Sequence, residues 1–287
     1  MKKIIKVKTR RFIAKYLSNI VFCVYFFKFK LLDFKNKTPI IILTPGKTGS
    51  SSVYYTLKKV FKMYNVFHVH YLTSNSIDNA KQNHLISDRK SLPLHLIVSE
   101  LLLNKIKNYK GTLKIITILR EPISRSISSF FQNIDFHKNS LEESNLIINE
   151  SMALEVIERQ ISRSVDDVNN WINLEIKENF NIDIYENRFP NKKYIIFKNQ
   201  NVELLLLKVE DLDCVFENAT KEFFDLRKGL SLINYNIGSE KYYSNQYKTI
   251  KNKIKLSNEI IDKILYSKYV THFYEDYIDK ISNKYRN

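Results

Sequence analysis

A strand, a loop and a helix in succession carry the side chains best suited to chemistry. The β-branched run Ile40 to Leu43 predicts a buried strand of a parallel sheet, and a helix is expected after the loop that follows it. The first N–H groups of a helix have no partner inside the helix and attract anions. Glycines permit a tight turn with positive φ, and a lysine adds a mobile positive charge. The loop is therefore predicted to cradle a phosphate-like group, and its residues are Gly46, Lys47, Thr48, Gly49, Ser50, Ser51 and Ser52.

This loop differs from the best-known phosphate-binding motif. A Walker A loop needs a glycine five positions before Gly46, and Ile41 stands there. One of the three serines is predicted to cap the helix. An ordinary strand-to-helix turn with a surface lysine is the alternative that this pattern leaves open.

A second candidate site follows another apolar run. Leu113 to Leu119 predicts a buried strand, and Pro122 is suited to the first turn of the helix that comes next. Arg120 then stands at the carboxyl end of a parallel strand, where ligands bind in open α/β sheets. Ser128 lies on the following helix. A guanidinium and a hydroxyl can clamp a phosphate, although an arginine here can equally form a structural salt bridge.

Two histidines share one face of a further predicted strand. The stretch from 66 to 71 alternates, so the side chains of His68 and His70 are expected on the same side of the sheet. His95 and His272 fall in helical patterns and are expected to be structural.

The remaining pattern predicts an α/β fold with a central, mainly parallel sheet flanked by helices. Helices are expected over 53–64, 92–107, 123–133 and 141–180, and a hairpin over 194–197 and 202–209. A polar segment, 234–244, precedes two final helical patterns. We expect residues 38–287 to form one domain.

Composition gives broader limits. The chain has 287 residues, 44% of them hydrophobic, and no uncharged apolar run long enough to span a bilayer. Its net charge of +16 favours an anionic partner, but lysines occur throughout the sequence. Cys23 and Cys214 lie far apart, which is typical of a reducing compartment, argues against zinc and predicts two packing residues.

The first 37 residues are basic and aromatic. Lysines and arginines precede an apolar stretch, Ile20 to Phe27, that is followed by further lysines. A helix lying on an anionic membrane surface is one interpretation, and a helix packed on the domain is the other.

Taken together, the two candidate sites resemble the sulfotransferases that use 3′-phosphoadenosine 5′-phosphosulfate (PAPS). The resemblance covers about residues 39–133 and rests on the Gly46–Ser52 loop and on Arg120 with Ser128 eight positions later. It implies a P-loop-like three-layer fold. It also implies that the loop holds the 5′-phosphosulfate and that Arg120 and Ser128 hold the 3′-phosphate.

Several later segments resemble a bacterial family of capsular polysaccharide synthesis proteins named for an Asn-Lys-Trp-Tyr-Ser motif. This sequence reads Glu-Lys-Tyr-Tyr-Ser over 240–244, which departs at the first and third positions. The surrounding segments that carry the resemblance are Asn170–Trp171, Phe180–Tyr185, Leu204–Leu212 and Ser267–Tyr274.

The sulfotransferase resemblance suggests roles for individual residues. Lys47 would neutralise charge on the bridging oxygen, and His70, with His68 as the second choice, would take the proton of the acceptor. Glu100 and Glu210 are further candidates for the base, although Glu210 and Asp211 are expected to cap a helix. Lys241 would close over the 3′-phosphate.

The expected enzyme is a metal-independent sulfotransferase acting on a hydroxyl of capsular polysaccharide, lipopolysaccharide or a lipid-linked precursor. We expect it in the cytoplasm, with no nucleic-acid partner and with residues 1–37 available for peripheral contact with the plasma membrane. Two alternatives remain open. One is a nucleotide-dependent kinase, and the other is a non-catalytic basic protein that binds nucleic acid or membrane.

Overall fold

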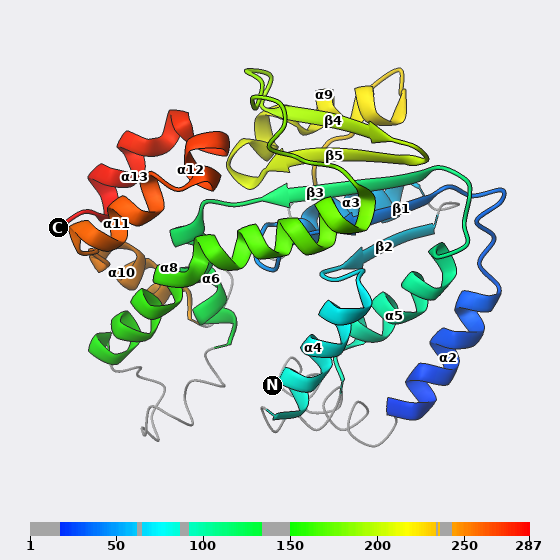
Figure 1. The fold of residues 1–287 in the computed structure, drawn as a ribbon, viewed down its shortest axis with the longest axis horizontal. Coiled ribbons are helices and arrows are strands. Elements are labelled where there is room, and N and C mark those ends of the chain that lie inside the picture. The colour runs from blue at the N-terminus through cyan, green and yellow to red at the C-terminus, as the bar shows by residue number, and fades with distance from the viewer. Residues whose placement is uncertain (1–17, 62–64, 87–91, 134–149, 234, 236–242) are drawn as a thin grey trace.

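A five-stranded sheet forms the centre of the molecule (Figure 1). The computed structural model describes residues 18–61, 65–86, 92–133, 150–233, 235 and 243–287. The strand order is β2-β1-β3-β5-β4; every neighbouring pair is parallel except β4 with β5. The α/β class and the mainly parallel sheet are therefore confirmed. The strands are β1 Pro39–Leu43, β2 Asn65–Val69, β3 Leu113–Leu119, β4 Tyr194–Asn199 and β5 Val202–Lys208.

Helices cover both faces of the sheet, which makes the three layers. Since β1 is buried at every position and β3 and β5 at nearly every one, their continuous apolar runs contact helices on either side. One face packs against α3 Ser50–Val60 and α9 Leu212–Phe224. The apolar residues of the other face belong to a larger cluster that also includes side chains of α2 Ser18–Lys30, α5 Leu94–Ile106, α6 Pro122–Gln132, α8 Glu150–Ile172, α10 Ser244–Lys253, α11 Asn258–Leu265, α12 Lys268–Phe273 and α13 Ile278–Tyr285. Helices α10 and α11 pack on α6 and α8.

The chain reverses its winding direction at β1 and β3. After β1 it enters α3 on one face, and after β3 it enters α6 on the opposite face. The two connections diverge at the carboxyl edge of adjacent parallel strands, which is the topological switch point of an open α/β sheet. The loops that carry Lys47 and Arg120 both begin there.

Several elements differ from the sequence expectation. Residues 74–89 are polar and no element was predicted there, yet a helix forms, α4 Ser74–Ile86. The C-terminal region after 243 holds four described helices, α10 to α13, rather than two. Helix α8 continues into a π-helical segment, Asn173–Glu178. The β4–β5 hairpin is confirmed. The first part of the helix expected over 141–180 and residues 236–242 lie outside the described part of the chain.

Helix α2 packs on the domain through one stripe. Phe29 is buried, and Val21 and Tyr25 contact the same core from the preceding turns. The packed interpretation of this segment is thus confirmed for that stripe, while residues 1–17 lie outside the description. Within the described ranges, no helix is both long and apolar enough to cross a membrane.

Both cysteines are exposed, so the prediction that they are packing residues is wrong. Cys23 lies on α2 outside its packed stripe, and Cys214 lies on α9 one position before Val215, which faces the sheet.

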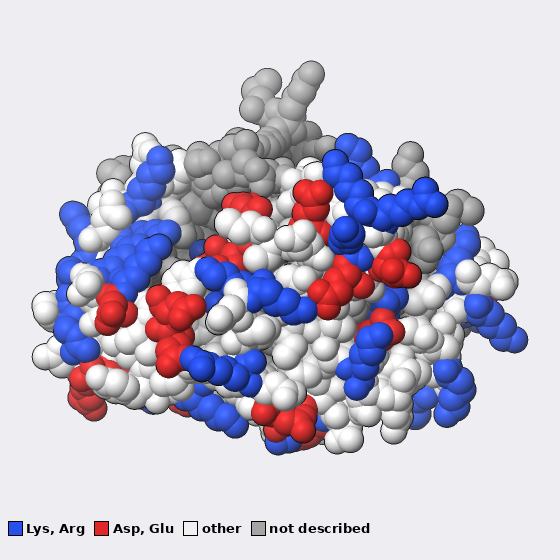
Figure 2. Space-filling model, turned by 90° about the horizontal axis from the view of Figure 1, so that it is seen from above, with Lys and Arg blue, Asp and Glu red and all other residues white. Residues whose placement is uncertain are grey.

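Charges of both signs are mixed on one face of the molecule (Figure 2). On the face that Figure 2 shows, Lys and Arg side chains are interspersed with Asp and Glu. The net charge of +16 therefore identifies no partner on that face.

Candidate functional site

A cleft of about 830 Å³ lies at the carboxyl edge of β1 and β3. The residues predicted for the loop, apart from Gly46 and Ser52, line it together with His68, His70, Arg120 and Ser128. Five of the described lining residues are Lys or Arg and none is Asp or Glu, so the cleft is suited to an anion. Its lining is Lys47, Thr48, Gly49, Ser50, Ser51, His68, His70, Arg120, Ser128, Phe131, Gln132, Tyr235, Tyr243, Ser244, Tyr247, Lys248, Lys251, Asn252 and Lys284.

The loop after β1 depends on a left-handed glycine. Gly49 has φ 70°, and a Cβ added there would lie 2.8 Å from Cγ2 of Val209. Gly46 would tolerate a positive φ as well, but the other positive φ of the loop, 74°, belongs to Lys47. The backbone turns at the lysine itself, so its side chain and carbonyl take directions that a right-handed residue would not give them.

The helix after this loop is not capped as predicted. Gly49 occupies the N-cap of α3, and no side chain of the described residues caps it. Ser52 instead pairs with Tyr235, whose N–H donates to Oγ of Ser52 at 3.1 Å and whose carbonyl accepts from that hydroxyl at 3.2 Å. The N-terminus of α3, with Gly49, Ser50 and Ser51, therefore faces the cleft.

Arg120 joins the two loops of the switch point. One guanidinium nitrogen, Nη1, donates to the carbonyl of Lys47 at 2.9 Å. The Lys47 ammonium in turn donates to the amide oxygen of Gln132 on α6. The hydroxyl of Tyr269 donates to the Arg120 carbonyl at 3.0 Å. Both positive side chains line one cleft, and no carboxylate is paired with Arg120 among the salt bridges of the described residues.

Two glutamates fix the start of α6, just behind Arg120. The carboxylate of Glu121 caps this helix by accepting from the N–H groups of Ile123 and Ser124 at 2.6 and 2.8 Å. Glu210 accepts from the N–H of Glu121 at 3.0 Å and from the Tyr274 hydroxyl at 3.1 Å. Burial raises the pKa of the Glu210 carboxyl. Glu210 is therefore a positioning residue and does not line the cleft.

The capping role predicted for Glu210 and Asp211 is wrong. Glu210 supports α6, as described above, and the side chain of Asp211 does not cap α9. Asp211 instead forms a buried ion pair with Lys208 at 3.1 Å and accepts from the hydroxyl of Tyr277 at 2.8 Å. A nearby lysine and tyrosine compete successfully for a carboxylate that the sequence places at a helix start.

His70 is oriented as a proton acceptor. Its Nδ1 lies 2.8 Å from the carbonyl of Thr44, and because a carbonyl only accepts, Nδ1 carries the proton. The neutral ring therefore presents an unprotonated Nε2. Burial lowers the pKa of His70, with a smaller effect in the same direction from the charge of Lys47, and the bond to Thr44 opposes both. His70 is thus neutral at physiological pH.

The two neighbouring histidines are neutral as well. The ring centroids of His68 and His95 each lie 5.2 Å from that of His70, which confirms that His68 and His70 share a face. Burial, followed by repulsion from His70, lowers the pKa of His68 to about 3 and that of His95 to about 4. His68 also stacks near Tyr54 of α3.

The other proposed bases lie elsewhere. Glu100 pairs with Lys81 at 2.8 Å and does not line the cleft. His272 packs against Phe273 and Tyr185, in agreement with a structural role.

The end of α8 and its π-helical extension hold the backbone around His70. Trp171 donates its indole N–H to the carbonyl of His70 at 2.8 Å. Glu175, fully buried, accepts from the N–H of Leu72 at 2.5 Å and from the hydroxyl of Thr73 at 2.8 Å. The π-helix places this carboxylate against the turn after β2, and such segments are frequent at functional sites.

A cationic face on α10 escaped the sequence analysis. Ser244, Tyr247, Lys248 and Lys251 recur at positions one, four, five and eight of the helix, so they share one side, and all four line the cleft. Lys284 of α13 joins them. Burial, reinforced by Arg120, lowers the pKa of Lys251. Lys241, proposed for this role, lies outside the described residues.

An aromatic side chain lies at the same cleft. The ring centroid of Tyr235 is 3.8 Å from that of Tyr55 on α3, and Tyr235 is 48% exposed. A ring held on one face by Tyr55 and open to solvent elsewhere can stack against a planar ligand.

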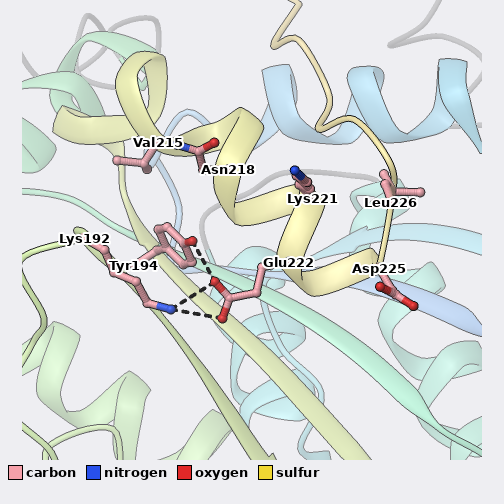
Figure 3. A pocket seen from close by; sticks show the side chains of 8 residues that line it. All are labelled: Lys192, Tyr194, Val215, Asn218, Lys221, Glu222, Asp225 and Leu226. Carbon is pink, nitrogen blue, oxygen red and sulfur yellow. Dashed lines mark hydrogen bonds and ion pairs between the residues drawn. The ribbon is translucent and has the colours of Figure 1, made fainter.

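A second hollow, of about 500 Å³, differs in its electrostatics (Figure 3). Glu222 of α9 accepts there from the ammonium of Lys192 at 3.0 Å and from the hydroxyl of Tyr194 at 2.7 Å. The charge of that lysine is thus already balanced within the protein.

The fold and the site define an α/β protein with a strongly basic cleft at the topological switch point of its sheet. Residues 143–275 match the NKWYS family, described as "Putative capsular polysaccharide synthesis protein". No curated protein and no solved structure matches the chain. The match confirms the narrower of the two resemblances over that range.

The matched region supplies one side of the site. Trp171, which binds the backbone of His70, and the cleft-lining residues of α10 lie within it. Tyr243 and Ser244, the last two positions of the stretch that resembles the family motif, also line the cleft. Lys47, His70, Arg120 and Ser128 precede the matched range.

Proposed function

We propose that this protein is a sulfotransferase that moves a sulfuryl group from 3′-phosphoadenosine 5′-phosphosulfate to a hydroxyl of a cell-surface glycan. The observation that carries the proposal is the bond from Arg120 to the carbonyl of Lys47. It joins two cationic loops at the switch point of the sheet, where one ligand can contact both.

The donor has two anionic ends, which fits two cationic subsites. The N-terminus of α3, with Lys47, Thr48 and Gly49, would hold the 5′-phosphosulfate. Arg120 and Ser128 would hold the 3′-phosphate, and Lys251, whose charge interacts with that of Arg120, would take the part expected of Lys241. Tyr235 offers a ring for the adenine.

In the proposed reaction, the acceptor hydroxyl oxygen attacks the sulfur atom. A new S–O bond forms, and the bond between sulfur and the bridging oxygen of the 5′-phosphate breaks. Nε2 of His70 accepts the hydroxyl proton, and adenosine 3′,5′-bisphosphate leaves with the negative charge. Lys47 would stabilise that charge as it develops, which is the interaction that lowers the barrier.

The neutral state of His70 supports its role as the base. A histidine that is already neutral at physiological pH accepts a proton without first losing one. The bond to Thr44 also keeps the basic nitrogen from rotating away. His68 is the second candidate, because it lines the same cleft and its Nε2 is buried without a partner.

The family match directs the search for the acceptor. Because residues 143–275 match a family described as capsular polysaccharide synthesis proteins, we propose capsular polysaccharide, lipopolysaccharide or a lipid-linked precursor as the acceptor. A precursor would be modified in the cytoplasm.

Binding of adenosine 3′,5′-bisphosphate without magnesium, measured by calorimetry, tests the donor assignment. Arg120→Ala should weaken binding at least tenfold, whereas Lys221→Ala, which removes a lysine from the second hollow, should leave it unchanged. Magnesium-dependent ATP binding with no response to the bisphosphate would show a kinase instead. If the double variant Lys47→Ala, Arg120→Ala still binds RNA in a salt-dependent manner, the protein is a basic nucleic-acid-binding protein instead.

Transfer itself is measured with radiolabelled donor and capsule or lipopolysaccharide fractions of the host. Label should enter a glycan with the wild-type protein and not with His70→Ala. If the protein binds the bisphosphate but transfers label to no fraction, the assignment of the donor site stands and the proposed class of acceptor is wrong.

A further inference from the structure

Helix α2 uses only one stripe of its surface for packing. Val21, Tyr25 and Phe29 follow one another at four-residue intervals and contact the core of the domain. Phe29 lies with its ring centroid 5.4 Å from that of Phe67 on β2. This stripe accounts for the attachment of α2 beside α5, at the end of the molecule opposite the C-terminal helices (Figure 1).

The remainder of α2 is apolar and exposed. Ile20, Val24 and Phe27 are 56, 58 and 63% exposed, and Leu31 after the helix is 86% exposed. At about 100° per residue these positions form one stripe within about 60° on the helix surface. Phe22 and Phe26 lie about 170° and 130° from the centre of this stripe, and they are 38 and 39% exposed. A helix that is apolar on all sides normally has every side covered, so a partner is expected on this face.

Charge indicates which partner it is. Lys28 and Lys30 lie on either side of the exposed stripe, about 70° and 90° from its centre. The Lys30 ammonium lies 4.8 Å from the ring centroid of Phe26, so its alkyl stem follows the aromatic surface. Residues 1–32 of the sequence contain nine Lys or Arg and no Asp or Glu.

We propose that this face of α2 lies in the interfacial region of an anionic lipid bilayer. Since another side of α2 is packed on the domain, the face left for a partner is an apolar stripe with a lysine on each flank, which suits a helix resting in the plane of a membrane. The apolar stripe enters the acyl boundary, and the lysines contact phosphate groups of anionic lipids. The proposal does not depend on the reaction assigned to the cleft.

Co-sedimentation with vesicles tests this directly. The full chain is mixed with vesicles of phosphatidylcholine alone or with an equal amount of phosphatidylglycerol. Val24→Ser with Phe27→Ser removes two exposed apolar side chains of α2. Val60→Ser with Tyr266→Ser is the matched control, since those side chains are 51 and 74% exposed elsewhere.

The wild type and the control should sediment with the anionic vesicles, and the α2 variant should bind at least tenfold more weakly. Added salt and omission of phosphatidylglycerol should each weaken wild-type binding. Equal binding by the α2 variant, or no binding by the wild type, overturns the proposal. Light scattering that shows a dimer broken by the α2 variant, with no vesicle binding, would assign the face to a second copy.

Discussion

Replacing Gly49 by alanine should damage both the stability of the protein and its anion site. Two costs add at this position. The left-handed conformation at φ 70° costs an alanine about 1–2 kcal/mol. Its Cβ would also lie 2.8 Å from Cγ2 of Val209, and relieving such overpacking costs about 1–3 kcal/mol.

The expected loss in free energy of unfolding is therefore about 2–5 kcal/mol, measured by urea denaturation. In a Val209→Ala background the steric part should disappear, so Gly49→Ala should then cost only about 1–2 kcal/mol. Bisphosphate binding should weaken in the single variant, because the loop must shift to accommodate the methyl group.

Gly46→Ala is the control within the same loop. Its φ is not positive, and no atom lies within 4 Å of a Cβ added there, so alanine should be neutral or stabilise by up to about 1 kcal/mol. A Gly49→Ala protein within about 0.5 kcal/mol of wild type would refute the steric and conformational reasoning. So would an equal loss in Gly46→Ala.

Three other predictions address the cleft. Lys47→Ala should lower kcat far more than bisphosphate affinity, because the contact of Lys47 strengthens as charge develops in the transition state. Lys251→Ala should instead weaken bisphosphate affinity by about tenfold or more without a matching loss in kcat. Calorimetry measures the affinities, and initial rates measure kcat. Trp171→Phe, which removes the donor to the His70 carbonyl, should reduce kcat while leaving bisphosphate affinity unchanged, and equal losses in both would indicate general disruption. His68 and His95 have pKa values of about 3 and about 4 in the folded protein. Since an unfolded histidine titrates near pH 6.5, the unfolded state binds more protons between these values, and stability should fall by about 2 kcal/mol per histidine on going from pH 7 to pH 5. Urea unfolding at both pH values measures this, and a pH-independent result would contradict the buried neutral state.

Local patterns were sufficient to predict the framework of the site. The apolar runs of β1 and β3 are buried on both faces, and each is followed by a polar residue with an evident chemical use. Because the carboxyl ends of parallel strands meet at one edge, Lys47 and Arg120 could be placed together from sequence alone. The histidines were placed on one face for the equally local reason that a strand alternates.

Features that depend on distant contacts were not predictable. Lys47, and not Gly46, takes a left-handed conformation, and the loop contacts Arg120 and Val209, which are distant in the sequence. The face of α10 was missed because lysines are common throughout the chain, so a spacing of three and four residues did not stand out. Recognising Lys251 required knowing that this helix folds back onto the cleft.

The contacts of the loop after β1 have a consequence for folding kinetics. The bond from Arg120 to Lys47 spans 73 residues of sequence, and the one from Tyr235 to Ser52 spans 183. Contacts of such high sequence separation form slowly, because loop-closure entropy is lost before they contribute. The loop therefore acquires its native shape only when β3 and the segment after α9 have docked. In refolding followed by a fluorescent nucleotide, binding competence should emerge with the last phase, after most of the sheet has formed.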